Sequence, residues 1–271
     1  MSAESGRFTV LHLSDVHATE TGLLYGRVDG LGRLRDVAEY ARCSGITPEA
    51  VVITGDLAQR GNPGAYPAIA AACAQLEAAV AAPVYTVIGN HDDPVAARAL
   101  PGHEAGHDRV HLHERFRFVL LDSHRGELSP EQLGWLRAVL AEDHGEGTIL
   151  ALHHAPMGSP IPTLQKQGLR NAAGFLDALG GSDVRLILAG HFHHPLSASV
   201  RGLPVQVAPS LAYHQVMNAG PDAVAGHDAP MFSLVQFTDE GVRATSLSLH
   251  TPDPLFVSPV SHPATPTQKE S

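Results

Sequence analysis

Aspartate and histidine residues occur along this chain directly after short runs of apolar residues. Asp15 and His17 follow the first run, and Asp56 follows the second. Alternation along an extended backbone places Asp15 and His17 on the same side, so a carboxylate and an imidazole point together. Carboxylate and imidazole groups are common ligands of divalent ions such as manganese, iron and zinc. The pattern therefore predicts chemistry that depends on metal ions.

The same types of side chain recur further along the chain. The stretch Gly89-Asn90-His91-Asp92-Asp93 follows one apolar run, His153-His154 follows another, and His191 and His193 follow a third. Buried carboxylates without partners cost free energy, so a structural explanation would need several independent ion pairs at one sheet edge. We interpret these groups as one site instead.

Oxygen and nitrogen ligands without cysteine suit hard or borderline divalent ions and argue against a structural thiolate zinc site. Two such ions about 3.5–4 Å apart clamp the attacking and leaving oxygens of a displacement at phosphorus. They also lower the pKa of a shared water from about 16 to about 7, which supplies hydroxide at neutral pH. The residues therefore predict a two-metal centre that hydrolyses phosphate esters.

Strands must carry these side chains to one place. Residues 8–13, 50–54 and 83–88 are apolar and rich in β-branched residues, which predicts three strands. A helix that begins after Asp29 and a second helix at about 65–81 separate them. Strands that alternate with helices favour parallel pairing with right-handed crossovers. Ligands bind at the carboxyl ends of such strands, where the polar residues lie.

The second half of the chain continues this pattern and then changes. Ser129 and Pro130 predict the start of a helix, and a further helix is expected to end near Leu179. Further strands are predicted at 110–113, 116–121, 148–152 and 184–189. Four later strands, near 196–200, 205–208, 231–238 and 242–249, have no helices between them, which predicts antiparallel ribbons that form a second sheet. We expect a single domain over residues 1–250, with the ribbon region at about 196–250.

Composition restricts the classes of partner. The formal net charge of -10 over 271 residues argues against a protein that binds duplex nucleic acid, which needs a basic face. The two cysteines, Cys43 and Cys73, lack CxxC spacing and are expected to be buried free thiols. Residues 251–271 are rich in proline and show no periodicity, which predicts a surface-hugging or disordered tail.

The sequence predicts a cytoplasmic protein without membrane attachment. Met1 to Arg7 is short and polar and lacks the layout of a signal peptide. The alanine-rich run at 65–82 is interrupted by Gln75 and Glu77, so it resembles a soluble helix rather than a membrane span.

The order and spacing of these motifs resemble the calcineurin-like metallophosphoesterase family over residues of about 8–215. The motifs are Asp15-Val16-His17, Gly55-Asp56, Gly89-Asn90-His91-Asp92, His153 and Gly190-His191-Phe192-His193. The flanking segments resemble the bacterial class III cyclic-nucleotide phosphodiesterases and the related glycerophosphodiesterases; they are Leu24-Tyr25-Gly26, His153-His154-Ala155-Pro156 and Tyr213-His214-Gln215-Val216. Those enzymes often carry proline at the position of Ala155, a difference expected to alter the loop and not the ligand. The resemblance implies an α/β fold, a four-layer α/β/β/α sandwich of two mixed β-sheets flanked by helices.

The resemblance also implies roles for single residues. Asp15, His17, Asp56 and His193 would hold the first metal, and Asp56, Asn90, His153 and His191 the second, with Asp56 bridging. The sequence alone leaves His153 and His154 as alternatives, and the resemblance favours His153. His91 would contact the phosphoryl oxygens or protonate the leaving alkoxide, with Asp92 orienting it. Asn90 and His214 would bind the substrate alongside His91.

The implied cofactors are two divalent ions, with Mn and Fe foremost and Mg, Co and Zn as alternatives. The implied reaction is hydrolysis of 3′,5′-cyclic AMP and other cyclic nucleotides to the 5′-monophosphate by a metal-bridging hydroxide. A glycerophosphodiesterase, a broad phosphodiesterase and a non-catalytic scaffold of the same fold remain open. The C-terminal ribbons resemble those that relatives use for a dimer contact, so a homodimer is a further expectation.

Overall fold

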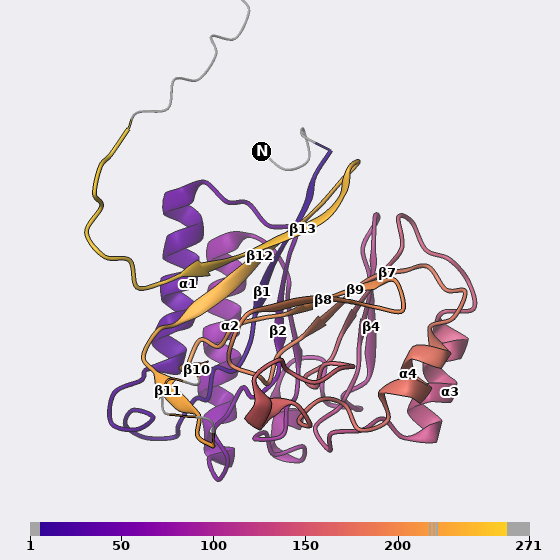
Figure 1. The fold of residues 1–271 in the computed structure, drawn as a ribbon, viewed down its shortest axis with the longest axis horizontal. Helices are drawn as coiled ribbons and strands as arrows, with labels where there is room; N and C mark the ends of the chain where they lie inside the picture. Colours follow the sequence, from indigo (N-terminus) through magenta and orange to yellow (C-terminus); the bar gives the residue numbers. More distant parts are fainter. Residues whose placement is uncertain (1–5, 217, 219, 221, 259–271) are drawn as a thin grey trace, which may run out of the picture.

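The computed structural model describes residues 6–258 except 217, 219 and 221. Its strands form two large sheets and one two-stranded ribbon, and a pair of helices covers the outer face of each sheet (Figure 1). The expectations for the first five residues and for residues 259–271 lie outside the described residues.

The first sheet carries three parallel strands at its centre and edge. Its order is β13-β12-β1-β2-β3, and β12 and β13 are antiparallel. The strands are β1 (Phe8–Leu13), β2 (Ala50–Thr54), β3 (Val84–Val87), β12 (Met231–Thr238) and β13 (Gly241–Ser248). Two long helices connect the parallel strands, α1 (Gly30–Ser44) and α2 (Tyr66–Val80).

The second sheet has the order β4-β5-β6-β7-β9-β8, with β5, β6, β7 and β9 parallel. Its strands are β4 (Arg109–Leu112), β5 (Arg117–Leu120), β6 (Thr148–Ala151), β7 (Val184–Ala189), β8 (Leu196–Val200) and β9 (Leu203–Val207). The helices beside it are α3 (Pro130–Val139) and α4 (Ala172–Ala178). The ribbon consists of β10 (His214–Val216) and β11 (Ala225–His227). In the described part of the chain, 3₁₀ turns lie at Pro63–Ala65, Ala96–Ala99 and Pro162–Leu164.

The expectation that the C-terminal strands form a sheet of their own is wrong. β9 pairs in parallel with β7, and β12 pairs with β1, where Phe8 lies opposite Phe237. Val235 and Phe237 of β12 enter the core between the sheets, whereas Val205 of β9 packs on the other face of its sheet, beside α3 and α4. A run of strands without helices does not reveal which sheet edge is open to receive them.

The four predicted layers are confirmed by three apolar clusters. Phe8 and Phe118 lie in the cluster between the two sheets, and the Phe8 ring centroid is 4.7 Å from that of Phe116. A second cluster joins the first sheet to α1 and α2, and a third joins the second sheet to α3 and α4. These layers hold both sheets in a fixed relation, so the carboxyl ends of their parallel strands meet at a common edge.

Local sequence explains where the helices begin and end. Asp29 Oδ1 accepts a hydrogen bond of 2.8 Å from Gly32 N at the start of α1, and Gly45 ends that helix with a φ of 64°. Ser129 and Gln132 form the capping box of α3. Gly30 is required because a Cβ there would lie 2.0 Å from Val16 O. The start of α1 is therefore packed directly against the loop that carries Asp15 and His17.

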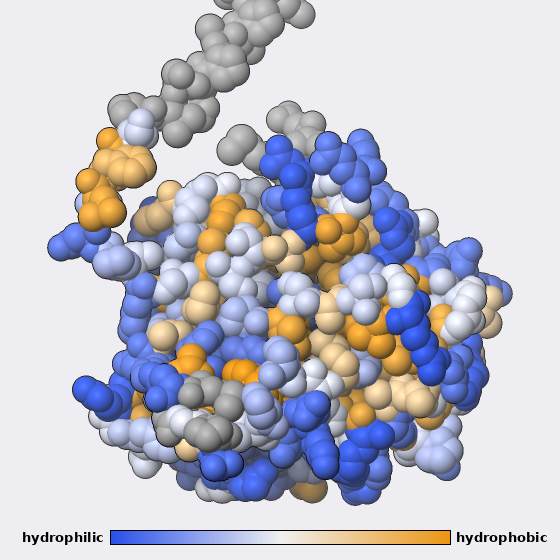
Figure 2. All heavy atoms as spheres, viewed as in Figure 1, coloured by the Kyte–Doolittle hydropathy of each residue, from blue (hydrophilic) through white to orange (hydrophobic). Residues whose placement is uncertain are grey.

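The face shown in Figure 2 mixes hydrophilic side chains with groups of apolar ones, and exposed apolar side chains also lie along the C-terminal stretch, at Leu255, Phe256 and Val257. No helix among the described residues is long and apolar enough to cross a bilayer. Cys43 is exposed and bonded to Glu39, so the expectation of two buried thiols is wrong for it, whereas Cys73 is partly buried. Residues 251–258 extend away from the body with exposed side chains and do not hug its surface (Figure 1).

Candidate metal centre

The polar residues predicted from the sequence converge at one edge of the two sheets. The loops after β1 and β2 run side by side, because Asp15 N donates to Gly55 O at 3.0 Å and His17 N to Asp56 O at 2.9 Å. The loops after β6 and β7 are joined by a bond of 3.0 Å from Gly190 N to His153 O. Backbone bonds therefore fix the loops before any side chain is considered.

Four of these side chains form a buried group. Asp15, His17, Asp56 and His193 each offer one ligand atom, and these atoms lie within 4.8 Å of one another. His193 Nε2 is 3.1 Å from both His17 Nε2 and Asp15 Oδ1. This group contains the same four residues as the first predicted ligand set.

The second predicted set lies beside the first. His153 Nε2 is 3.1 Å from Asn90 Oδ1 and 3.2 Å from His191 Nδ1. Asp56 Oδ2 is 3.5 Å from His153 Nε2 and 3.7 Å from His17 Nε2. This single carboxylate oxygen thus lies between the two groups.

Three histidines are oriented by oxygen acceptors outside the groups. The Nδ1–H of His17 donates to Gln59 Oε1 at 2.8 Å, that of His153 to Thr54 O at 2.7 Å, and that of His193 to Tyr213 O at 3.1 Å. In its neutral form, each ring then turns the lone pair of its Nε2 toward the interior of the site. Metal-binding histidines are typically oriented by such a hydrogen bond from their other ring nitrogen.

The donor set fits a pair of divalent cations. Asp15 Oδ1 is buried and accepts no hydrogen bond from the residues that the structure describes. The Nε2 atoms of His17 and His193 face each other at 3.1 Å while both Nδ1–H groups are engaged elsewhere. Lone pairs that face each other around an unpaired carboxylate oxygen are stabilised by a cation held between them. The aspartate and histidine side chains of this site can therefore bind metal ions.

Burial and mutual attraction shift the pKa values here in opposite directions. Burial alone would raise the pKa of Asp56, but His153 and His17 lower it well below the ordinary value. Burial alone would lower the pKa of His153, but Asp56 and Asp15 raise it to about 9. For His17 and His191 burial dominates and lowers the pKa of each to about 4. The site thus favours ionised carboxylates, as metal binding requires.

His154 lies against the same site but has a different environment. Its ring lies 4.4 Å from that of His191, and it can form a group with His153 and His191. Ser123 Oγ accepts bonds from the backbone N–H groups of His153 and His154, so its own hydrogen is directed to His154 Nδ1 at 3.3 Å. The neutral ring then carries its proton on Nε2.

His91 is oriented by a residue that the sequence analysis did not identify. Its Nδ1 donates to Gln59 Oε1 at 3.1 Å, so one amide oxygen serves both His17 and His91. The expectation that Asp92 orients His91 is not met. Asp92 instead accepts backbone bonds from Leu57, Ala58 and Gly89 and a bond of 3.0 Å from Tyr66 Oη, which ties the loops after β2 and β3 together.

His214 begins β10, near the first group. Its neighbour Gln215 donates a backbone bond of 2.9 Å to His193 O, and His214 Nδ1 is buried without a partner among the described residues. The Tyr213 ring, which the sequence analysis noted only within a motif, lies 4.2 Å from the His193 ring. β10 is therefore in direct contact with the site.

The backbone is strained where the site is built. Among the described residues, eight that are not glycine have positive φ, and five of them belong to the two groups: Asp15, His17, Asp56, His191 and His193, with φ between 48° and 76°. Residues in this conformation concentrate at functional sites because the surrounding structure must hold them there. The sharp turns allow two side chains of one short loop to point into the same site.

Residues 8–195 match the model of a family described as calcineurin-like phosphoesterase. A probable cyclic nucleotide phosphodiesterase of Rhodococcus erythropolis is 40% identical over 86% of this chain and 81% of its own. A cAMP/cGMP dual specificity phosphodiesterase of Mycobacterium tuberculosis is 38% identical over 82% of this chain and 73% of its own. The fold is similar to that of a dimetal phosphatase from Danio rerio, with a TM-score of 0.59 and 18% identity over 90% of this chain and 99% of that one.

Proposed function

Because this chain belongs to the calcineurin-like phosphoesterase family, we propose that it hydrolyses 3′,5′-cyclic AMP and other cyclic nucleotides to 5′-monophosphates. The observation that carries the proposal is the position of Asp56 Oδ2 between two groups of inward-facing histidines. The names of the relatives supply the substrate class.

The proposed ligands of the first ion are Asp15, His17, Asp56 and His193. Those of the second are Asp56, Asn90, His153 and His191, with Asp56 shared. When bound, such a pair of ions activates a water molecule and neutralises charge on the phosphoryl oxygens. The bonds of Ser123 support His153 rather than His154 as the ligand, because they leave the proton of His154 on Nε2.

The chain's own residues handle the substrate and the proton. With its Nδ1–H held by Gln59, His91 can donate from Nε2 only when the ring is protonated. In that form it would protonate the leaving alkoxide or bind a phosphoryl oxygen. Asn90 and His214 would contribute further polar contacts to the phosphate. Asp92 would act indirectly, by holding the loop that carries Asn90 and His91.

Manganese and iron are the proposed metals, since both suit mixed carboxylate and imidazole ligands. Hydrolysis of glycerophosphodiesters is the second candidate activity, because the same centre would act on any accessible diester. A non-catalytic scaffold is disfavoured by the complete set of inward-facing donors. The proposal includes a cytoplasmic location and a homodimer.

The test compares hydrolysis of cyclic AMP, cyclic GMP, a glycerophosphodiester and an aryl phosphodiester by the manganese-loaded protein. We expect cyclic nucleotides to give the highest kcat/KM and metal analysis to find two ions per chain. The Asp56→Asn variant should lose both activity and metal. Hydrolysis of glycerophosphodiesters alone would overturn the substrate, and full activity of Asp56→Asn would overturn the site.

A further inference from the structure

Two tyrosine rings form a corner beside the metal centre. The Tyr213 ring packs on the His193 ring at 4.2 Å and lies 5.8 Å from the His17 ring. The Tyr25 ring meets Tyr213 at 5.8 Å with an angle of 62° between the ring planes. We call Tyr25 and Tyr213 the aromatic corner; it joins the residue directly before β10 to the loop after β1.

Packing does not explain the position of Tyr25. The residue is 71% exposed, and its backbone has a φ of 53°, a conformation that bulky residues rarely adopt. Two backbone bonds of 3.0 Å between Leu24 and Val28 close the short loop that presents it. A large ring held in a strained conformation and left exposed is an indication of function.

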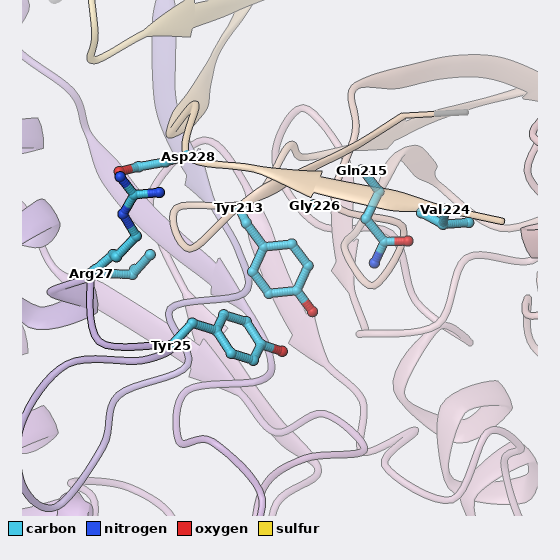
Figure 3. Close-up of a pocket in the computed structure, with 8 residues that line it drawn as sticks. Tyr25, Arg27, Tyr213, Gln215, Val224, Gly226 and Asp228 are labelled. Atoms are coloured by element: carbon cyan, nitrogen blue, oxygen red, sulfur yellow. The ribbon is translucent and has the colours of Figure 1, made fainter. Parts of the chain in front are cut away.

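A pocket of about 430 Å³ opens at the aromatic corner. This volume is within the range of about 300–1,000 Å³ typical of sites for small molecules. Both tyrosine rings line the pocket with their hydroxyl ends toward the same side, and Gln215 extends into it from β10 (Figure 3). A Cβ on Gly226 would lie 3.0 Å from Tyr213 Cδ2, so glycine leaves room for this ring.

Gln215 offers the hydrogen-bonding groups of its side-chain amide to the pocket. Its backbone is fixed by the bond to His193 O, and its side-chain amide lines the pocket. An amide presents both donors and an acceptor, so it can pair with a ligand edge that offers acceptors or with one that offers donors. The pocket thus combines aromatic surface with the adaptable amide of Gln215, and Arg27 and Asp228 line it as well.

We propose that this pocket holds the purine base of the substrate, stacked on the aromatic corner with its edge toward Gln215. The inference rests on the proposed function, which places the phosphate at the adjoining metal centre. Stacking tolerates different bases because every base has a π-face, and the amide can turn to suit either purine. The pocket therefore binds adenine and guanine nucleotides with similar affinity.

The test measures binding of AMP, GMP and ribose 5-phosphate to the manganese-loaded protein by calorimetry. AMP and ribose 5-phosphate share the sugar and the phosphate, so the ratio of their Kd values isolates the contribution of the base. We expect AMP and GMP to bind at least about tenfold more tightly than ribose 5-phosphate. In Tyr25→Leu this ratio should fall by about tenfold, with the Kd of ribose 5-phosphate unchanged.

Tyr25→Phe is the matched control, because it keeps the ring and the same backbone strain and should retain the ratio. Tyr25 is chosen over Tyr213 because Tyr213 packs on a proposed metal ligand. An unchanged ratio in Tyr25→Leu, or equal weakening of AMP and ribose 5-phosphate, would overturn the inference. Binding is read without turnover, so a wild-type protein that does not hydrolyse cyclic nucleotides would refute the proposed function and not the base pocket.

Discussion

Gln59 provides a direct test of how the site is oriented, because one oxygen accepts hydrogen bonds from two histidines. Gln59→Leu keeps a similar volume and removes the acceptor of His17 and His91. The buried Nδ1–H of His17 would then lack a partner, at a cost of about 1–3 kcal/mol. Loss of residues that orient metal-binding histidines typically lowers metal affinity or activity by about 10–100-fold. We expect kcat/KM to fall within this range.

Gln59→Glu should change the pH dependence of kcat/KM in the opposite direction from Gln59→Leu. Burial lowers the pKa of His91 and the Asp56 carboxylate opposes that shift. A glutamate at position 59 adds a second negative charge and raises this pKa, whereas leucine lowers it. Because His91 donates only when protonated, the loss of activity at high pH should move upward in Gln59→Glu and downward in Gln59→Leu.

The assay is the pH profile of kcat/KM for cyclic AMP, together with the metal content of each variant. Gln236→Leu is the control, since among the described residues the Gln236 side chain bonds only to Thr9 Oγ1, at 3.4 Å, on the first sheet. It should change neither quantity. The reasoning is refuted if Gln59→Leu keeps two ions, full activity and the wild-type pH profile.

Three further predictions concern other parts of the structure. A Cβ in Gly89→Ala would lie 2.3 Å from Asp56 Oδ1, so metal content after dialysis and activity should each fall by about 10–100-fold. Asp183→Ala removes the carboxylate 2.9 Å from buried Arg117 and should lower the free energy of unfolding in urea by about 3–5 kcal/mol. Burial lowers the pKa of His103 to about 3 from 6.5, so the unfolded chain binds a proton that the folded chain does not between these pH values. The free energy of unfolding of the metal-free protein should therefore fall as the pH falls through this window. His103 contributes about 1.4 kcal/mol to this fall for each pH unit, and His103→Asn should lack that contribution.

The metal centre could be predicted from the sequence because its residues follow apolar strands whose carboxyl ends meet at one edge. Asp15 and Asp56 could therefore be proposed without knowledge of tertiary contacts, whereas the strand pattern alone left His153 and His154 as alternatives. Gln59 could not be found in this way, because its partners His17 and His91 lie 42 and 32 positions away and no local pattern links them.

Other features depended on tertiary structure for the same reason. Leu57, Ala58 and Gly89 donate to Asp92 through backbone N–H groups, which any residue could supply, and only Tyr66 donates from its side chain among the described residues. The sequence therefore could not show whether Asp92 fixes a loop or orients His91. The assignment of β9 and β12 to different sheets depends on which edge is open, and that is decided by packing between the layers.

The left-handed backbone at Asp15, His17, Asp56, His191 and His193 has an evolutionary consequence. Each such residue lowers the free energy of unfolding by roughly 1–2 kcal/mol relative to a glycine at the same place. Selection for stability alone would therefore favour replacing these residues, and selection for catalysis must retain them. A descendant released from selection for catalysis would become more robust by drifting to glycine or asparagine at these turns. Substitutions at these positions that aim at heat resistance would raise the thermal stability of the enzyme and abolish its turnover.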